Sequence, residues 1–460
     1  MPLAKSRVLS TLNEDGTRRW LYPRVFAGRF LKWRRLLAWV LLGLFTLVPY
    51  VRFQGKPLVL LDIPAREFTI LGFTFLPTDT VLLALLLVSL IVGIVLVTAL
   101  CGRLWCGWMC PQTVYLDFVY RPLERLFDGP PGPRHTPGKK STPVRSVLKY
   151  AVFLLVSAFL AHTFLAYFVG VDRLVQWVRQ SPFEHPASFL VMLAVTGLMM
   201  FDFSFFREQT CLVACPYGRF QSVMLDRDSL IVSYDVKRGE PRGKRGAGNR
   251  DAQSLGDCVD CGLCQDTCPT GIDIRDGLQM ECIACTQCID ACDRMMDAVG
   301  KPRGLVRFSS QNRMADGRGR LIRPRVIIYP SLLAITLSAL FVVLIGKQPA
   351  DVTLLRGMGV PFTELVPGEV TSQIRVKIKN RSGRDADYRV EIVDADGVKI
   401  TEGTNPISVS AGQSRTETLS IASPKSVFVL GRHDIKVRVT DGGKFDRQYT
   451  YRLVGPQSGT

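Results

Sequence analysis

The strongest chemical signal in the chain is a pair of cysteine runs, CVDCGLCQDTCP and CIACTQCIDAC. Each run has the spacing C-x2-C-x2-C-x3-C, in which three thiolates hold one iron–sulfur cluster and the fourth reaches a second cluster. We therefore expect two [4Fe-4S] clusters with crossed ligands. One ligand set is Cys258, Cys261, Cys264 and Cys292, and the other is Cys282, Cys285, Cys288 and Cys268.

Zinc is the alternative occupant of these runs, since four thiolates also suit Zn²⁺. Zinc sites normally use pairs of C-x2-C knuckles, whereas these eight cysteines stand in doubled runs of four. Pro269 follows the first run as the iron–sulfur pattern expects, but Asp293 stands at the corresponding position of the second run. That departure affects only the local turn, because all eight cysteine ligands are still present. The two runs therefore predict iron–sulfur clusters that transfer one electron at a time.

Five cysteines lie outside the two runs. Cys106 and Cys110 share the form C-x3-C-P with Cys211 and Cys215, whereas Cys101 has no counterpart. A proline disfavours helical geometry in the residue before it and is itself a favoured first residue of a helix. We therefore expect Cys110 and Cys215 at the N-termini of new helices.

Several uses are open for the two C-x3-C-P pairs. Helix dipoles and the nearby Arg103, Arg207 and Arg219 would favour thiolates there. Converging thiolates suit Cu(I) or a further iron–sulfur cluster, and they could also act as redox-active dithiols. Cysteine is also a small apolar residue that is often simply buried. Because the motif is repeated, we expect a catalytic, metal-binding role for Cys106, Cys110, Cys211 and Cys215.

The elements that must position these cysteines include membrane helices. The chain has 460 residues, 47% of them hydrophobic. Five stretches are apolar enough to cross a bilayer core of about 30 Å: residues 36–51, 80–100, 147–169, 187–206 and 326–346. The first stretch is the shortest. His162 and Asp202 lie within the third and fourth, and for His162 a hydrogen bond between helices is a better expectation than metal ligation.

Basic residues set the expected orientation of the chain. The formal net charge is +18, from 58 Lys and Arg against 40 Asp and Glu. Lys and Arg gather in residues 1–35 and, within the membrane core 36–206, in the loop 101–146, so the positive-inside rule places both in the cytoplasm. The segment 207–325 is then cytoplasmic too, and we expect a ferredoxin-like domain at residues 250–300 within it. No module for nucleic acid stands out, so nucleic acid is not an expected partner.

The last segment, residues 351–460, predicts a β domain on the other side of the membrane, which is the periplasm in a bacterium. Stretches such as QIRVKIKN and DIKVRVTDGGKFDRQYTYRLV alternate apolar and polar residues around D-G and G-G turns. An immunoglobulin-like sandwich is the natural fold, although its Cys…Trp…Cys core signature is absent. The fold class is thus a multi-domain membrane protein with a helical core, a twin-cluster ferredoxin domain and a β-sandwich.

Three stretches carry a resemblance to a known family. They are WCGWMCPQTVY, FREQTCLVACPYGRFQSVMLDRDSLIVSYDVKRGEPRG and CDRMMDAVGKPRGLVRF, the last overlapping the end of the second cysteine run. Because these stretches occur in the right order around the expected topology, the chain resembles the cytochrome c oxidase accessory proteins CcoG, also called FixG or RdxA, over essentially its whole length. The resemblance implies an inner-membrane cupric reductase with two [4Fe-4S] clusters that supports assembly of the cbb3-type oxidase. It also implies copper handling at Cys106, Cys110, Cys211 and Cys215.

The leading hypothesis is therefore a membrane metalloreductase that converts Cu(II) to Cu(I), whose thiolate ligands favour the product. The alternatives are a quinol-linked iron–sulfur relay and a non-enzymatic copper-binding assembly scaffold. Expected partners are a cytoplasmic electron donor that the sequence does not identify, and a copper transporter or chaperone. Membrane lipid is expected near the basic residues 242–250. A homodimer is one open assembly state.

Overall fold

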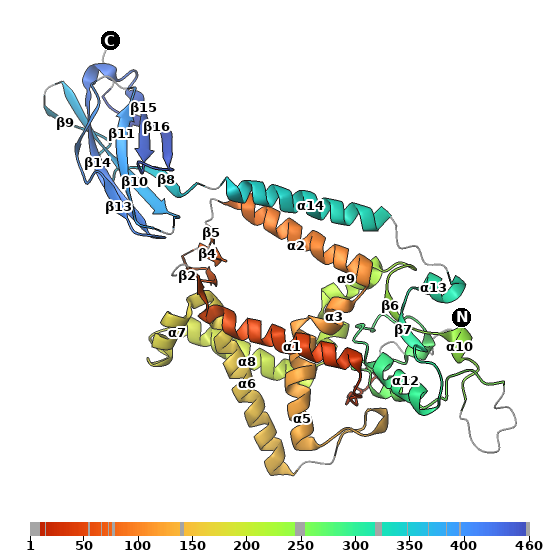
Figure 1. Ribbon diagram of the computed structural model, residues 1–460. Coiled ribbons are helices and arrows are strands. Elements are labelled where there is room, and N and C mark those ends of the chain that lie inside the picture. Colours follow the sequence, from red (N-terminus) through yellow and green to blue (C-terminus); the bar gives the residue numbers. More distant parts are fainter. Residues whose placement is uncertain are drawn as a thin grey trace. The chain divides into compact units, whose positions relative to one another are not determined.

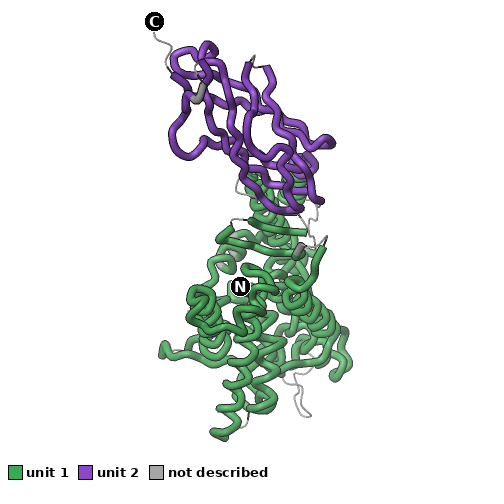
Figure 2. The backbone as a smooth tube through the Cα atoms, turned by 90° about the vertical axis from the view of Figure 1, so that its left-hand side faces the viewer, with its two compact units in different colours: residues 1–340 green, residues 341–460 purple. Residues whose placement is uncertain are grey.

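The computed structural model describes residues 10–456, apart from 14, 54–55, 66, 72, 76–78, 139–141, 244–253, 318–323, 347, 367, 383 and 395–396. The chain forms two compact units, residues 1–340 and 341–460 (Figure 2). The first unit holds most of the helices and all thirteen cysteines, and the second is built mainly of strands. Each unit is described by itself below.

Helices dominate the first unit (Figure 1). They are α1 (Arg29–Leu47), α2 (Thr80–Cys101), α3 (Leu104–Trp108), α4 (Pro111–Tyr115), α5 (Arg121–Asp128), α6 (Pro143–Val169), α7 (Val171–Val178), α8 (Pro186–Phe201), α9 (Pro216–Met224), α10 (Val236–Gly239), α11 (Leu263–Asp266), α12 (Gln287–Ala298), α13 (Gln311–Asp316) and α14 (Pro324–Ile345). Short 3-10 or π-helical segments are η1 (Val48–Tyr50), η2 (Leu116–Tyr120), η3 (Pro133–His135), η4 (Asp202–Phe206), η5 (Thr210–Ala214) and η6 (Ile274–Asp276).

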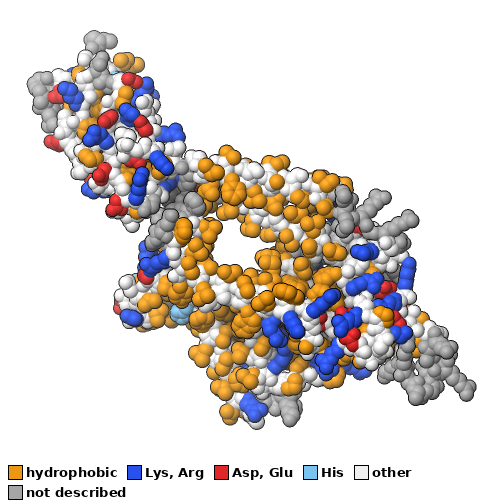
Figure 3. All heavy atoms as spheres, viewed as in Figure 1, with side chains coloured by type: hydrophobic (Ala, Val, Ile, Leu, Met, Phe, Trp, Pro, Cys, Tyr) orange, Lys and Arg blue, Asp and Glu red, His pale blue; other side chains and the backbone are white. Residues whose placement is uncertain are grey.

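Four helices in the described part of the chain are long and apolar enough to cross a membrane. They are Thr80–Cys101, Pro143–Val169, Pro186–Phe206 and Pro324–Ile345. Their bounds agree with the last four predicted spans, and hydrophobic side chains cover α2 and α14 on the face seen in Figure 3. An apolar surface of this extent is stable when lipid covers it, so the structure is that of a membrane protein.

The predicted first span, residues 36–51, lies mainly in α1, which is not one of these four helices. Its first two turns carry Arg29, Lys32, Arg34 and Arg35, so the apolar part is shorter than a bilayer core requires. Pro49, in the 3-10 turn that follows, prevents the helix from continuing. A count of five spans therefore stays a prediction.

Contacts at the two ends of α1 show its course. At its start, Asp290 of α12 accepts hydrogen bonds from the backbone N–H groups of Phe30 and Leu31, at 3.2 and 2.8 Å. After its end come strands β1 (Arg52–Phe53), β2 (Lys56–Pro57), β3 (Val59–Asp62), β4 (Glu67–Ile70) and β5 (Phe73–Phe75). Asp62 of β3 pairs at 3.2 Å with Arg173, just beyond α6. Helix α1 thus runs from the cysteine-rich module to the C-terminal end of α6, as a fifth span would.

The cysteine-rich module is closed by a two-stranded antiparallel sheet of β6 (Ile231–Tyr234) and β7 (Val306–Ser309). Helices α11 and α12 lie between these strands in the sequence; α11 lies within the first cysteine run, and α12 begins within the second. Its buried core includes Val232, Ile274, Ile289 and Leu305. Because β6 and β7 flank both runs, the module extends beyond the predicted 250–300 on each side.

The second unit is a β-sandwich, as the sequence predicts. Its strands are β8 (Ala350–Arg356), β9 (Thr363–Val366), β10 (Glu369–Asn380), β11 (Ala386–Val393), β12 (Lys399–Glu402), β13 (Ile407–Val409), β14 (Ser414–Pro424), β15 (Arg432–Thr440) and β16 (Asp446–Val454). One sheet has the order β12-β14-β10-β8 with β9 beside β10, and the other has the order β13-β11-β15-β16. Alternate residues of β10, such as Ile374, Val376 and Ile378, are fully buried between them.

Candidate functional site

The first set of predicted cluster ligands lines one cavity. Cys258, Cys261, Cys264 and Cys292 all face it, and we call it site I. Three of these cysteines belong to the first run, whereas Cys292 is the last cysteine of the second run and lies in α12. Cys261 is exposed, so site I lies at the surface of the module.

The second set lines a neighbouring cavity, which we call site II. Cys268, Cys282, Cys285 and Cys288 face it, together with Cys264 of site I. Cys264 is therefore in the wall of both cavities. The structure thus groups the eight cysteines in the crossed arrangement that their spacing predicts. Each group offers the four thiols that a cubane cluster needs as ligands.

Backbone geometry repeats between the two runs and explains how each run wraps a cavity. Asp260 and Gly262 have φ of 52° and 72°, and Ala284 and Thr286, at the equivalent positions of the second run, have 53° and 64°. Left-handed residues turn the chain sharply, so successive cysteines can face one centre. Three of these four residues carry a Cβ, and the strain is typical of a site whose geometry is set by what it binds.

Burial disfavours the thiolate form at two ligands of the module, Cys285 and Cys292. It raises the pKa of Cys285 and of Cys292 to about 12. Cluster ligation needs thiolates, so cluster assembly at these sites releases protons and becomes easier at higher pH. In the described residues no three His, Cys, Asp or Glu side chains are placed to hold a single metal ion.

The two C-x3-C-P pairs converge on one place. Cys110 is the N-cap of α4 and Cys215 is the N-cap of α9, each followed by proline, which confirms the predicted helix starts. Burial raises the pKa of Cys211, and the neighbouring Cys110, Cys106 and Cys215 raise it further. The charges of Cys110 and Cys215 likewise act on Cys106. We call these four residues the membrane-edge thiols.

Burial outweighs the stabilisation of thiolates that the helix N-termini and nearby arginines are expected to provide. Burial raises the pKa of Cys106 to about 11, although Arg103 opposes the shift. Burial also raises the pKa of Cys110, against the backbone N–H groups of Gln112 and Thr113 at the start of α4. The helix N-terminus thus acts in the predicted direction but is the weaker effect. A bound cation would offset this cost at Cys106 and Cys110.

The arginines predicted to assist these thiols behave differently from one another. Arg207 turns away and pairs with Glu124 at 3.0 Å and with Glu208 at 3.6 Å. Its predicted role beside the thiols is therefore wrong, because two acidic side chains offer it stronger partners. The side chain of Arg219 lies outside the described residues. Arg103 remains near Cys106.

The loop of site II packs directly on the first C-x3-C-P motif, a contact that the sequence did not predict. A Cβ added at Gly107, between Cys106 and Cys110, would lie 2.4 Å from the carbonyl oxygen of Ile283 and 2.8 Å from the backbone N of Cys285. The indole Nε1 of Trp108 donates to the carbonyl oxygen of Ala284 at 3.3 Å. Only glycine at position 107 allows this approach. The backbone of the first C-x3-C-P motif is therefore in direct contact with the backbone of the site II loop.

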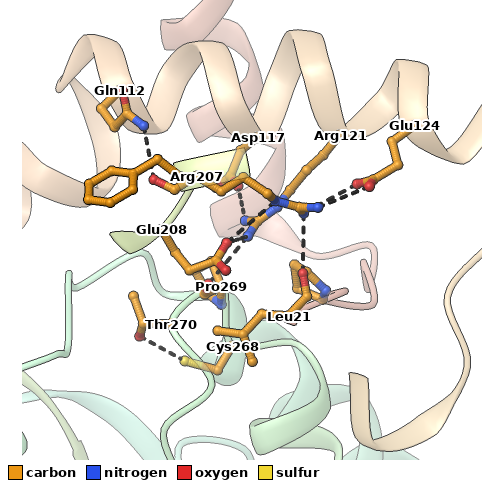
Figure 4. A network of polar contacts seen from close by, with 12 residues as sticks. Leu21, Gln112, Asp117, Arg121, Glu124, Arg207, Glu208, Cys268, Pro269 and Thr270 are labelled. Atoms are coloured by element: carbon orange, nitrogen blue, oxygen red, sulfur yellow. Dashed lines mark hydrogen bonds and ion pairs between the residues drawn. The ribbon is translucent and has the colours of Figure 1, made fainter. Parts of the chain in front are cut away.

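A buried ion network joins the membrane-edge helices to the module (Figure 4). Asp117 pairs at 2.6 Å with Arg121 and with Arg34, whose Nε donates to the carbonyl oxygen of Gly107 at 2.6 Å. Arg121 also pairs with Glu208 at 3.3 Å and donates to the carbonyl oxygen of Pro269, next to Cys268. Charged residues dispersed over four segments gave no sequence signal for this network.

Three further polar residues singled out in the sequence have local roles. The imidazole Nδ1 of His162 is 2.8 Å from the carbonyl oxygen of Ala158 in its own helix, so the predicted bond between helices is wrong. Asp202 accepts a hydrogen bond from the hydroxyl of Thr210. Cys101 is the last residue of α2.

Family models match three parts of the chain. Residues 206–311 match a "4Fe-4S dicluster domain" and residues 83–130 a "4Fe-4S binding domain". Residues 340–456 match the "IG-like fold at C-terminal of FixG". The first two matches include all four membrane-edge thiols as well as sites I and II. The chain therefore contains iron–sulfur binding domains and a FixG-type immunoglobulin-like domain.

Curated relatives resemble the chain over most of its length. It is 31% identical to Protein RdxA of Cereibacter sphaeroides, over 92% of this chain and 94% of that one. It is 30% identical to the nitrogen fixation protein FixG of Rhizobium meliloti, over 98% and 95% respectively. The ferredoxin-type protein NapH of Haemophilus influenzae is 24% identical over 58% of this chain and 88% of its own.

Proposed function

Because this chain belongs to the FixG/RdxA family of iron–sulfur proteins, we propose that it reduces Cu(II) to Cu(I) for the assembly of a cbb3-type cytochrome c oxidase. Clusters held at sites I and II would supply one-electron transfer. We assign copper to the membrane-edge thiols Cys106, Cys110, Cys211 and Cys215, because thiolates prefer Cu(I) and so favour the reduced product.

One observation carries this proposal: the contact between Gly107 and the Ile283–Cys285 backbone. It brings the backbone between Cys106 and Cys110 against the backbone of the site II loop. The thiol of Cys106 is packed with Ile283 and Cys285 in one buried cluster. Electrons that leave site II therefore have a short, dry route to a metal on these thiols.

The residues also give the path a direction. Exposed Cys261 offers site I to a soluble electron donor. Cys264 is shared by the walls of both cavities and connects site I to site II. Site II, whose four cysteines are buried or half-buried, faces the membrane-edge thiols. We propose a donor from the cytoplasm, and a copper transporter or chaperone as the partner that exchanges copper with the thiols.

The proposed location is the bacterial inner membrane. The N-terminus and the cysteine-rich module lie on the cytoplasmic side, and the immunoglobulin-like domain lies in the periplasm. Two features support this. Lys and Arg are concentrated in residues 1–35 and 101–146, and the N-terminal segment packs on the module, where the backbone N–H of Arg24 donates to the carbonyl oxygen of Asp266.

A second candidate is favoured by the match of residues 83–130 to a 4Fe-4S binding domain. Under it, the membrane-edge thiols hold a further cluster and the protein is an iron–sulfur relay. The four thiols offer a cluster the same number of ligands as sites I and II do.

Replacement of all four membrane-edge thiols by serine separates the two candidates. The copper proposal predicts that the variant keeps about 8 iron atoms per chain, the content of two [4Fe-4S] clusters, but no longer binds Cu(I) in anaerobic equilibrium dialysis. The matched control is Cys101→Ser, which should bind copper normally. A fall of about 4 iron atoms per chain in the fourfold variant would support the relay and contradict the copper site.

A further inference from the structure

Arg103 stands apart from the other buried arginines. Arg34, Arg121 and Arg207 are each paired with a carboxylate. Arg103 is only 5% exposed, yet in the described part of the chain no carboxylate forms an ion pair with it. Its Nη1 donates to the carbonyl oxygen of Met280, and its Nε has no hydrogen-bond partner among the described atoms.

A guanidinium buried without a counter-charge is costly, because it has lost its water and gained no anion. Nearby peptide carbonyls recover only part of that loss. Such a residue is explained most simply by an anion that forms beside it when the protein carries its metal centres. The surroundings of Arg103 contain two candidate anions.

The first candidate is site II. Arg103 lines a cavity of about 110 Å³ together with Cys282, a ligand of site II, between apolar walls that include Leu225 and Ile231. The carbonyl oxygen of Met280, two residues before Cys282, is its hydrogen-bond acceptor. A cluster bound by four thiolates is anionic and gains one more negative charge on reduction.

The second candidate is the group of membrane-edge thiols. The side chain of Arg103 lies close enough to the side chain of Cys106 to interact with it directly. Nη2 of Arg103 lies 2.9 Å from the position that a Cβ at Gly218 would take, and the carbonyl oxygen of Cys211 lies 3.2 Å from the same position. Glycine at position 218 thus lets the guanidinium reach the second C-x3-C-P pair.

We propose that Arg103 is the counter-charge shared by site II and the membrane-edge thiols, a positioning residue that raises the reduction potential of the site II cluster. The part of this proposal that concerns site II depends only on a cluster being bound there. The part that concerns the membrane-edge thiols rests on the proposed function, because it needs a metal on those thiols. In the electron transfer itself, the site II cluster loses one electron and Cu(II) gains it, with no bond or proton transferred.

The test replaces the charge and measures potentials in the full-length protein. Arg103→Met suits the apolar cavity wall and leaves no polar group to bury. In a reductive titration followed by electron paramagnetic resonance, the ratio of reduced to oxidised site II cluster should fall by about tenfold at a fixed potential, which is about 59 mV for one electron. The site I cluster should not change. Arg103→Lys, which keeps the charge, should shift the ratio less than Arg103→Met.

Arg303→Gln is the matched control, because it removes one positive charge from the same module at a side chain that is 67% exposed. It should leave both potentials unchanged. Unchanged potentials in Arg103→Met with full iron content would overturn the proposal. No copper is present in this titration, so its result is independent of whether copper is the substrate.

A second measurement decides the matter if the neutral variant holds its iron poorly. A counter-charge is needed most when the cluster is reduced, so Arg103→Met should lose iron faster in the reduced state than in the oxidised state. A purely structural arginine, which only holds the Met280 loop, predicts equal loss in both states, and that result would also overturn the proposal.

Discussion

At the scale of single residues, Gly107 is where the two halves of the site meet. A methyl group there would collide with backbone atoms of Ile283 and Cys285, which cannot rotate away. Gly107→Ala should therefore push the site II loop outward and destabilise the protein by about 1–3 kcal/mol, as overpacking does. Iron content should fall or the rate of copper reduction should drop, with site I retained.

The control for this prediction is Gly93→Ala in α2, since an added Cβ there meets nothing within 4 Å. It should leave iron content and rate at the wild-type level. Both quantities are measured on the same detergent-purified protein. Wild-type behaviour of Gly107→Ala would show that the close approach at Gly107 is not required.

Asp117 is the second residue whose replacement should lower the stability of the protein. Although burial opposes it, Arg121 and Arg34 hold the pKa of this carboxylate below its ordinary value. A lowered pKa means that the stabilisation is present above the ordinary pKa of about 4 and is lost as pH falls through the lower, folded value. Asp117→Asn leaves two buried arginines without their shared charge, so we expect a loss of about 3–5 kcal/mol.

Thermal unfolding in detergent at pH 7 measures this loss. Asp172→Asn is the control, because Asp172 pairs with Arg52 at an exposed position, where ion pairs contribute about 0–1 kcal/mol. A melting temperature of Asp117→Asn equal to that of the control would contradict a structural role of the network.

At the scale of elements, the sequence predicted what depends on local spacing. The cysteine runs, the helix starts after Cys110 and Cys215, and the alternation in β10 all follow from neighbours a few residues apart. The start of α1 does not: it is capped by Asp290, and a Cβ at Gly28 would lie 2.1 Å from the side chain of Asp290. The sequence of neither segment reveals that the two will pair. The contact of Gly107 with Cys285 and the buried ion network also join residues far apart in the chain, so local spacing could not predict them.

At the scale of the whole molecule, the chain has two units with separate cores. The sandwich buries its own side chains, including Val376, Ile378 and Phe445, and the first unit carries every cysteine ligand of the proposed path. Deletion of residues 351–460 should therefore leave iron content and the in vitro rate of copper reduction within about twofold, because the sandwich has its own core and contributes no cysteine ligand. Loss of the clusters on deletion would contradict this division of roles.

The central claim is that electrons from the iron–sulfur sites reduce copper. Its most direct test is anaerobic mixing of the chemically reduced protein with Cu(II), in which cluster oxidation and Cu(I) formation are recorded together. Two one-electron clusters predict about two Cu(I) ions per chain, formed at the rate at which the cluster absorbance returns. Cluster oxidation without Cu(I), or Cu(I) formed equally fast by the fourfold serine variant, would contradict the account.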